Sequence, residues 1–144
     1  MLMAVVSSTT AAAVDFTGEW AADICTEGKG KPCGNTGFSL IQNGSRICGD
    51  HTFMTANAGR MNEGFPGSVR GTVVGDTAVL VVTSGRNHGI VLGKASIVKN
   101  RLRWETLEEI SSGEPEGDSP LIYGKGILKY LGANVGNELR NACQ

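Results

Sequence analysis

Short runs of alternating apolar and polar residues, joined by two-residue turn signals, constrain this chain more than any other feature. The turn signals are Asn43-Gly44, Gly75-Asp76 and Lys99-Asn100. Alternation with a period of two is typical of strands with one buried face, and a two-residue link between such runs is typical of an antiparallel hairpin. Glycine is also abundant, with 21 in 144 residues, while proline occurs only four times. The pattern predicts an all-β fold rich in tight turns.

Each predicted turn implies a pairing register that places apolar residues together. Across the first turn, Leu40 faces Ile47 and Phe38 faces Gly49. The other two hairpins pair residues of like character on the inner face: Val73 with Ala78, Gly71 with Leu80, Val69 with Val82, Ile97 with Leu102, and Ala95 with Trp104. On the outer face of the third hairpin, Lys94 faces Glu105, a favourable cross-strand charge pair. A slip of one residue would invert both faces, so these registers support one another.

The remaining alternating segments raise the number of strands to eight. A first strand spans 16–24, an eighth is expected near 121–126, and 127–142 suits a short helical segment packed outside. The expected fold is an eight-stranded antiparallel up-and-down β-barrel formed by a single domain, 14–144. An open sandwich of seven or eight strands is the alternative.

The N-terminal residues and the cysteines both bear on export. Residues 1–13 are apolar or small and uncharged, which indicates either a signal-peptide remnant or a disordered tail. The chain contains four cysteines, Cys25, Cys33, Cys48 and Cys143. An even number of cysteines in a small chain favours disulfides and an exported protein, periplasmic or extracellular. We prefer the pairs Cys25–Cys33 and Cys48–Cys143. No cysteine pair has zinc-type spacing, so we expect no metal site.

The loops sort by length between the two ends of the expected barrel. The three tight turns lie at one end, and the longer connections, 26–36, 55–68, 84–89 and 108–120, lie at the other. Long loops in a compact domain frequently carry function. The first of them is cationic, with Lys29 and Lys31. We therefore assign partner or ligand binding to the long-loop end, with these candidates: His51, Arg60, Met61, Phe65, Arg86, His88, Glu114, Glu116 and Asp118.

Each of these candidates also has a purely structural interpretation. An acidic loop can simply be solvated, and Met61 and Phe65 can fold back over the core. His88 precedes a glycine and can be a turn residue. His51 belongs to the inward face, where an imidazole needs hydrogen-bond partners and can be a satisfied core histidine.

The predicted interior mixes large and small side chains. Trp20 and Trp104 point inward together with Phe38 and Leu40, while Gly93 and other small residues face them. An eight-stranded barrel is close to the size at which side chains either fill the lumen or leave space for one small ligand. Both arrangements remain open at this point.

Gly18-Glu19-Trp20, on a first strand entering from the closed end, resembles the Gly-X-Trp signature of calycin barrels, the lipocalins and avidins. The resemblance implies that Trp20 packs across the base of the barrel. The chain lacks the Thr-Asp-Tyr motif of lipocalins, and its two tryptophans are too few for an avidin-type biotin site. The resemblance therefore extends to the fold and not to the ligand. Small periplasmic β-barrel inhibitors of lysozyme are similar in size, export and disulfide content, without a matching motif.

The chemistry of the chain favours binding over catalysis. The net charge of −1 provides no field for nucleic acid, and no apolar run is long enough for a membrane span. Nucleophile elbows, phosphate loops, zinc motifs and dinucleotide fingerprints are absent from the sequence, and no cofactor is expected. The leading hypothesis is a non-catalytic protein that blocks a partner, such as an inhibitor or immunity protein of a secreted hydrolase. The alternatives are a carrier of a small apolar ligand and a small barrel isomerase or cyclase. The oligomeric state is open.

Overall fold

A computed structural model describes residues 13–25 and 32–144 of the chain. The predicted signal-peptide remnant, apart from Ala13, and the loop cations Lys29 and Lys31 lie outside the described residues. The described part contains nine strands, one 3-10 turn over Ala56–Ala58 and one α-helix, α1 (Asn137–Ala142). The strands are β1 (Gly18–Ile24), β2 (Gly34–Asn43), β3 (Arg46–Met54), β4 (Met61–Glu63), β5 (Val69–Val74), β6 (Thr77–Thr83), β7 (Ile90–Val98), β8 (Arg101–Ser111) and β9 (Lys125–Gly132).

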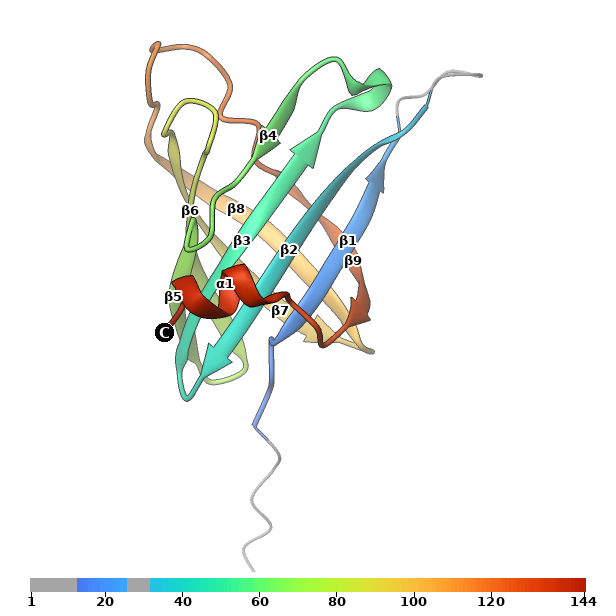
Figure 1. Cartoon of the computed structure of the whole chain (residues 1–144), viewed down its shortest axis with the longest axis vertical. Helices are drawn as coiled ribbons and strands as arrows, with labels where there is room; N and C mark the ends of the chain where they lie inside the picture. The colour runs from blue at the N-terminus through green and yellow to red at the C-terminus, as the bar shows by residue number, and fades with distance from the viewer. Residues whose placement is uncertain (1–12, 26–31) are drawn as a thin grey trace, which may run out of the picture.

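Eight of the strands form a closed antiparallel barrel, as the sequence predicts (Figure 1). The sheet runs β2-β1-β9-β8-β7-β6-β5-β3, and pairing of β2 with β3 closes it. The additional strand, β4, pairs with Thr52–Met54 of β3, whereas β5 pairs with Arg46–Gly49. Because β2 occupies the other edge of β3, β4 and β5 share one edge, and the chain between them bulges out of the wall. No helix of the described residues is long and apolar enough to cross a membrane.

Two of the three predicted registers are confirmed, and the first is wrong. The pairings Val73 with Ala78 and Ala95 with Trp104 occur as expected. In the first hairpin, Leu40 pairs with Gly49 rather than with Ile47. The turn residues are Gly44 and Ser45, and only Gly44 has a positive φ, 61°, as a type II′ turn requires. The shift is two residues, so every side chain keeps its predicted face.

The C-terminal elements also differ from the prediction. The eighth barrel strand is β9, which begins at Lys125, so the expected strand near 121–126 and the helix from Ile127 are wrong. The spacing of Ile127, Leu128 and Leu131 fits a helix, but the segment is a strand. The alternation of β9 points Leu128 toward the core and leaves Ile127 and Leu131 exposed. The helical segment is limited to α1, which lies outside the barrel over β2 and β3 (Figure 1).

Both preferred disulfides are present. Cys25 is bonded to Cys33, next to the loop between β1 and β2, and Cys48 of β3 is bonded to Cys143 just after α1. The second bond joins α1 to the outer wall, where Val135 and Leu139 are buried. Two disulfides are compatible with an exported protein.

Large side chains packed onto small ones fill the barrel interior. Trp104 is fully buried, and its ring lies 4.9 Å from that of Phe38, centroid to centroid. A methyl group on Gly93 would come within 2.2 Å of the Trp104 ring. Likewise, a Cβ on Gly71 would lie 2.8 Å from a Leu80 methyl. The small inward residues therefore make room for large side chains on the adjacent strands. Val91 and Leu128, which the sequence did not assign to the core, complete it.

Candidate functional site

Three long connections meet at the end of the barrel opposite the tight turns (Figure 1). They span 55–68, 84–89 and 112–124, and together we call them the rim. The last connection begins and ends later than predicted, because β8 is longer and β9 starts later. It remains at the predicted end because the count of eight barrel strands is correct.

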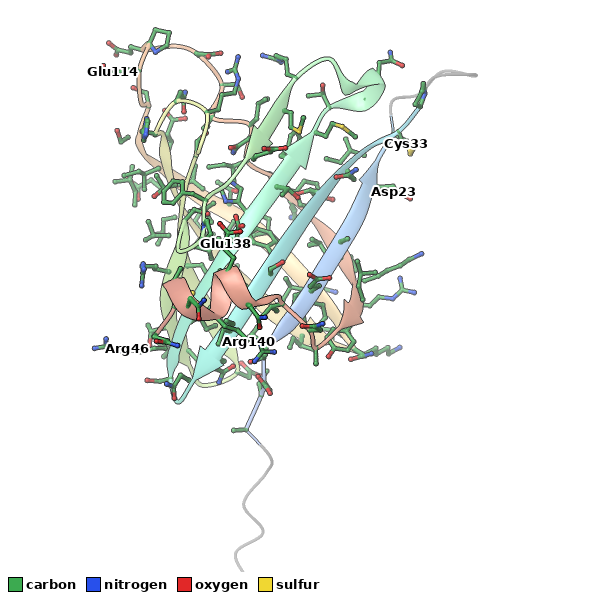
Figure 2. All side chains as sticks on the ribbon, viewed as in Figure 1. Asp23, Cys33, Arg46, Glu114, Glu138 and Arg140 are labelled. Atoms are coloured by element: carbon green, nitrogen blue, oxygen red, sulfur yellow. A yellow bond between two sulfur atoms is a disulfide. The ribbon has the colours of Figure 1, made fainter. Side chains whose placement is uncertain are left out.

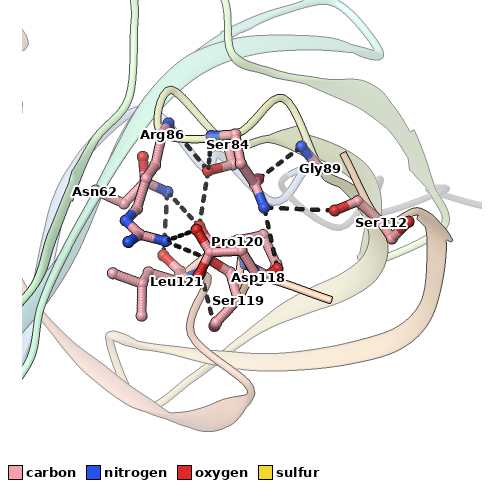
Figure 3. A network of polar contacts seen from close by, with 10 residues as sticks. Asn62, Ser84, Arg86, Gly89, Ser112, Asp118, Ser119, Pro120 and Leu121 are labelled. Carbon is pink, nitrogen blue, oxygen red and sulfur yellow. Dashed lines mark hydrogen bonds and ion pairs between the residues drawn. The ribbon is translucent and has the colours of Figure 1, made fainter. Parts of the chain in front are cut away.

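Buried polar side chains connect the three rim segments (Figure 3). Asn62 is fully buried, and its amide nitrogen lies 3.0 Å from the carbonyl oxygens of both Pro120 and Leu121. Its amide oxygen accepts the Gly85 N–H at 3.0 Å. Ser84 Oγ donates to the Pro120 carbonyl at 2.7 Å. Asn62 of segment 55–68 and Ser84 of segment 84–89 thus donate to the same carbonyl oxygen, that of Pro120 in segment 112–124.

Asn87 provides a second set of connections. Its amide nitrogen lies 3.1 Å from the Asp118 carbonyl oxygen and 3.4 Å from that of Ser112 (Figure 3). Its side-chain oxygen accepts the Gly89 N–H at 2.9 Å. Leaving a buried polar group without its hydrogen-bond partner costs stability, so these contacts favour one arrangement of the loops over the alternatives. The rim is therefore held in a defined shape.

Two predicted binding residues pair with each other. The Arg86 guanidinium forms an ion pair with Asp118 and donates to the Ser119 carbonyl at 3.1 Å (Figure 3). The hydrogen bond from Arg86 lowers the pKa of the Asp118 carboxyl below its ordinary value. Both side chains are roughly two-thirds covered, at 30% and 29% exposure. Their contacts tie 84–89 to 112–124.

His51 lies below the rim, on the inner face of β3. It is 3% exposed, with Nδ1 3.1 Å from Ser68 Oγ and Nε2 2.9 Å from the Asn62 amide nitrogen. Nε2 accepts from the amide, so the hydrogen of neutral His51 is on Nδ1 and is donated to Ser68. Burial lowers the pKa of His51 to about 4. The imidazole is therefore neutral near pH 7 and hydrogen-bonded at both nitrogens.

The other predicted binding residues form the exposed surface of the rim. Met61 is 52% exposed and Phe65 is 42% exposed, so neither folds back over the core. Arg60 and His88 are exposed, and His88, with φ of 60°, is a turn residue whose N–H donates to Ser84. Glu114 and Glu116 are also exposed, and Figure 2 shows Glu114 at the far tip of its loop.

Sequence reasoning missed the residues that organise this site. The binding candidates predicted from the sequence do not include Asn62, Ser68, Ser84 or Asn87. Asn62 lies on β4, which was taken as part of a loop, so the strand alternation that would place its side chain inward was not visible. Within the described residues, no group of three or more His, Cys, Asp or Glu side chains is placed to hold a metal ion.

Trp20 lies at the opposite, closed end. Its indole nitrogen donates to the Phe16 carbonyl at 3.0 Å, and its ring lies 4.9 Å from that of Tyr130. The protein is a closed eight-stranded antiparallel barrel with an ordered rim, which is compatible with a calycin-like barrel. No protein-family model, curated protein or solved structure matches the chain.

Proposed function

We propose that this chain is an exported, non-catalytic binding protein of calycin-like architecture that blocks a partner protein through the rim. The partner class is a secreted hydrolase, for which the chain would act as an inhibitor or immunity protein. The observation that carries the proposal is a rim fixed from below by Asn62, Ser84 and Asn87 that displays apolar and acidic side chains to solvent.

A fixed rim supports tight binding because little conformational entropy is lost when a partner docks. Exposed Met61 and Phe65 are suited to be apolar contacts, since methionine and aromatic residues are enriched where proteins meet.

The charge of the rim indicates the chemistry of the partner. From Trp104 to Gly124, which covers most of β8 and the adjoining rim segment 112–124, the chain has no Lys or Arg and carries six Asp or Glu residues, whereas the other rim segments contribute Arg60, Glu63 and Arg86. Asp118 pairs with Arg86 and Glu105 with Lys94 and Lys125, which leaves Glu108, Glu109, Glu114 and Glu116 without an ion pair in the described residues. A basic cleft is the complementary surface.

The packed interior favours this proposal over the two alternatives. A carrier or a confining cyclase needs internal space, whereas Trp104 lies over Gly93 and Leu80 over Gly71. His51, the main polar group inside, is already hydrogen-bonded to Ser68 and Asn62.

The test compares Glu114→Gln/Glu116→Gln with a matched control, Asp15→Asn/Asp76→Asn, which removes two acids from the closed end. Asp118 is left unchanged because it anchors the rim to Arg86. Inhibition constants are measured against a panel of secreted hydrolases with basic clefts, with lysozyme first. For an inhibited enzyme, we expect the rim variant to bind roughly tenfold more weakly, since two exposed ion pairs contribute about 1.4 kcal/mol together. The control should match the wild type.

The expected loss should shrink at high salt, because ions screen exposed charges. Equal inhibition by the rim variant and the control would contradict the role of the rim. Failure to inhibit any member of the panel, together with a small apolar molecule retained in native mass spectrometry, would favour the carrier instead.

A further inference from the structure

The side wall of the barrel has a gap where β1 and β9 separate. Their ladder has only three pairs, Glu19 with Gly132, Trp20 with Tyr130 and Ala21 with Lys129. Beyond this point β9 continues to pair with β8, while Ala22–Ile24 pair with β2 alone. A hollow of about 460 Å³ opens between the two strands, within the size range of small-ligand sites. We call it the side groove.

The side groove has an apolar lining that reaches the core. Ile127 and Leu131 stand on its β9 side, 50% and 63% exposed. Ala21 lies opposite, and the side chains of Ala22 and Tyr123 pack against the buried core beneath. Large exposed aliphatic side chains beside a hollow frequently mark a binding surface.

Two cations lie next to each other in the side groove and form no ion pair with any other described residue. Arg101 and Lys129 are direct cross-strand partners in the β8–β9 ladder, and both line the hollow. Like charges directly opposite each other destabilise a sheet. In the described part of the chain neither makes an ion pair, whereas Glu105 nearby lies between Lys94 and Lys125. An anion bound between Arg101 and Lys129 would relieve their repulsion.

The β1 edge of the side groove also has free hydrogen-bonding capacity. Within the described residues, the backbone of Ala22–Ile24 has ladder partners on the β2 side only. Backbone N–H and C=O groups at a strand edge are satisfied by water or by another extended chain. An alkyl chain with an anionic head would fill the apolar lining and meet the cations, but it would cover these groups without bonding them.

We propose that the side groove binds an extended peptide segment that ends in a free C-terminal carboxylate. The peptide adds to the edge of β1 in the antiparallel direction, which brings its end to the level of Ala21 and places the carboxylate between Arg101 and Lys129. An apolar side chain of the peptide then faces Ile127, and the carboxylate lies next to Leu131 at the other side of Lys129. Asp23, which also lines the hollow, disfavours an acidic side chain in the peptide. Apart from Tyr123, which also belongs to the rim segment 112–124, this site shares no residue with the rim, and it does not depend on the proposed blocking function.

The probe is a mixed-sequence pool of hexapeptides, apolar at alternate positions and free of acidic residues, prepared with a free carboxylate and separately with a C-terminal amide. Backbone amide shifts of the labelled full chain are followed by NMR during titration. We expect shifts at Ala22–Ile24 and Gly126–Lys129, and roughly tenfold weaker binding of the amidated pool, because a hydrogen-bonded charge is lost.

Arg101→Ala/Lys129→Ala should abolish the preference for the carboxylate. Arg103→Ala is the matched control, since Arg103 lies on the same strand, two residues from Arg101, and does not line the hollow. It should retain the full preference. Equal binding of the two pools, shifts confined to other residues, or no shifts at all would overturn the proposal. Dodecanoate is titrated in parallel, and binding of dodecanoate but not of the peptide pool would overturn it in favour of an anionic amphiphile.

Discussion

At the scale of single residues, His51 illustrates how position determines role. The alternation of β3 points it inward, and this much follows from the sequence. Its hydrogen-bond partners do not follow from the sequence. Ser68 lies 17 residues away, and Asn62 lies on a strand that the sequence pattern does not predict. An inward histidine could have lined a ligand cavity, but the fold surrounds its ring with two hydrogen-bond partners.

The burial of His51 predicts a pH dependence of stability. Its pKa is about 4 in the folded chain and near 6.5 when exposed, so on acidification the unfolded chain binds the proton first. Stability is therefore fully present above about pH 6.5 and falls as the pH drops toward 4. Between pH 7.5 and 5, we expect His51 to account for a loss of about 2 kcal/mol.

Urea unfolding of the wild type and His51→Gln at both pH values measures this term. The raised pKa of Asp50, which burial causes, acts in the opposite direction and is present in both proteins, so it cancels in the comparison. His88→Asn removes an exposed histidine and serves as the control, which should behave as the wild type. An identical pH dependence of stability in His51→Gln and the wild type would show that His51 binds protons equally in both states.

At the scale of elements, the hairpins show where local signals suffice. Gly75-Asp76 and Lys99-Asn100 are the turns expected, and their registers follow. Asn43-Gly44 carries the stronger hairpin signal, yet Asn43 ends up in β2 and the turn moves one residue on. Pairing of Phe38 with His51 along a long two-strand ladder outweighs the preference of one dipeptide.

Strand β8 shows a second limit of pattern reading. It extends to Ser111, beyond the predicted end at Leu107. The prediction stopped short because two bulges against β7 interrupt the alternation of apolar and polar residues. Leu107 and Ile110 are skipped by the ladder, and both are about half exposed. A bulge inserts one residue and reverses the facing pattern beyond it, so a search for strict alternation stops there.

The third hairpin offers an element-scale prediction. Lys99 and Asn100 have φ of 52° and 60°, which a type I′ turn needs and which lysine adopts unfavourably. Lys99→Asn/Asn100→Gly should stabilise the chain by about 1 kcal/mol in urea unfolding. Asn100→Ala should destabilise it by a similar amount. A change in the same direction for both variants would show that turn conformation does not limit stability here.

At the scale of the whole molecule, the disulfides and α1 complete the barrel. A six-residue helix is too short to be stable alone, so α1 depends on the buried Leu139 and on the bond from Cys143 to Cys48. The rim is likewise a property of the whole, since its amides connect segments that adjoin only once the barrel has closed.

The two disulfides should differ in their contribution to stability. Cys48 and Cys143 are 95 residues apart, whereas Cys25 and Cys33 are eight apart. From loop-closure entropy, Cys48→Ala/Cys143→Ala should cost about 4.7 kcal/mol and Cys25→Ala/Cys33→Ala about 2.5 kcal/mol. Urea unfolding of the two double variants measures the difference. A larger loss for the short loop would mean that native contacts, and not the constraint on the unfolded chain, dominate.

The sequence by itself determined the all-β class, the inner face of the hairpins and the end of the barrel that carries the long loops. Among three possible connectivities it favoured the disulfide pairs that the structure contains. These features depend on local terms: the two-residue period, turn residues and the number and spacing of cysteines. Trp104 and Leu80 could be placed inside on this basis alone.

Only the tertiary structure decided the register of the first hairpin, the start of β9, the contacts of Asn62 and Asn87, and the gap between β1 and β9. Each depends on partners far apart in the chain, such as Asn62 with Leu121 or Arg101 with Lys129. The free energy of such pairs appears only when closure of the barrel brings them together, so no local pattern encodes it.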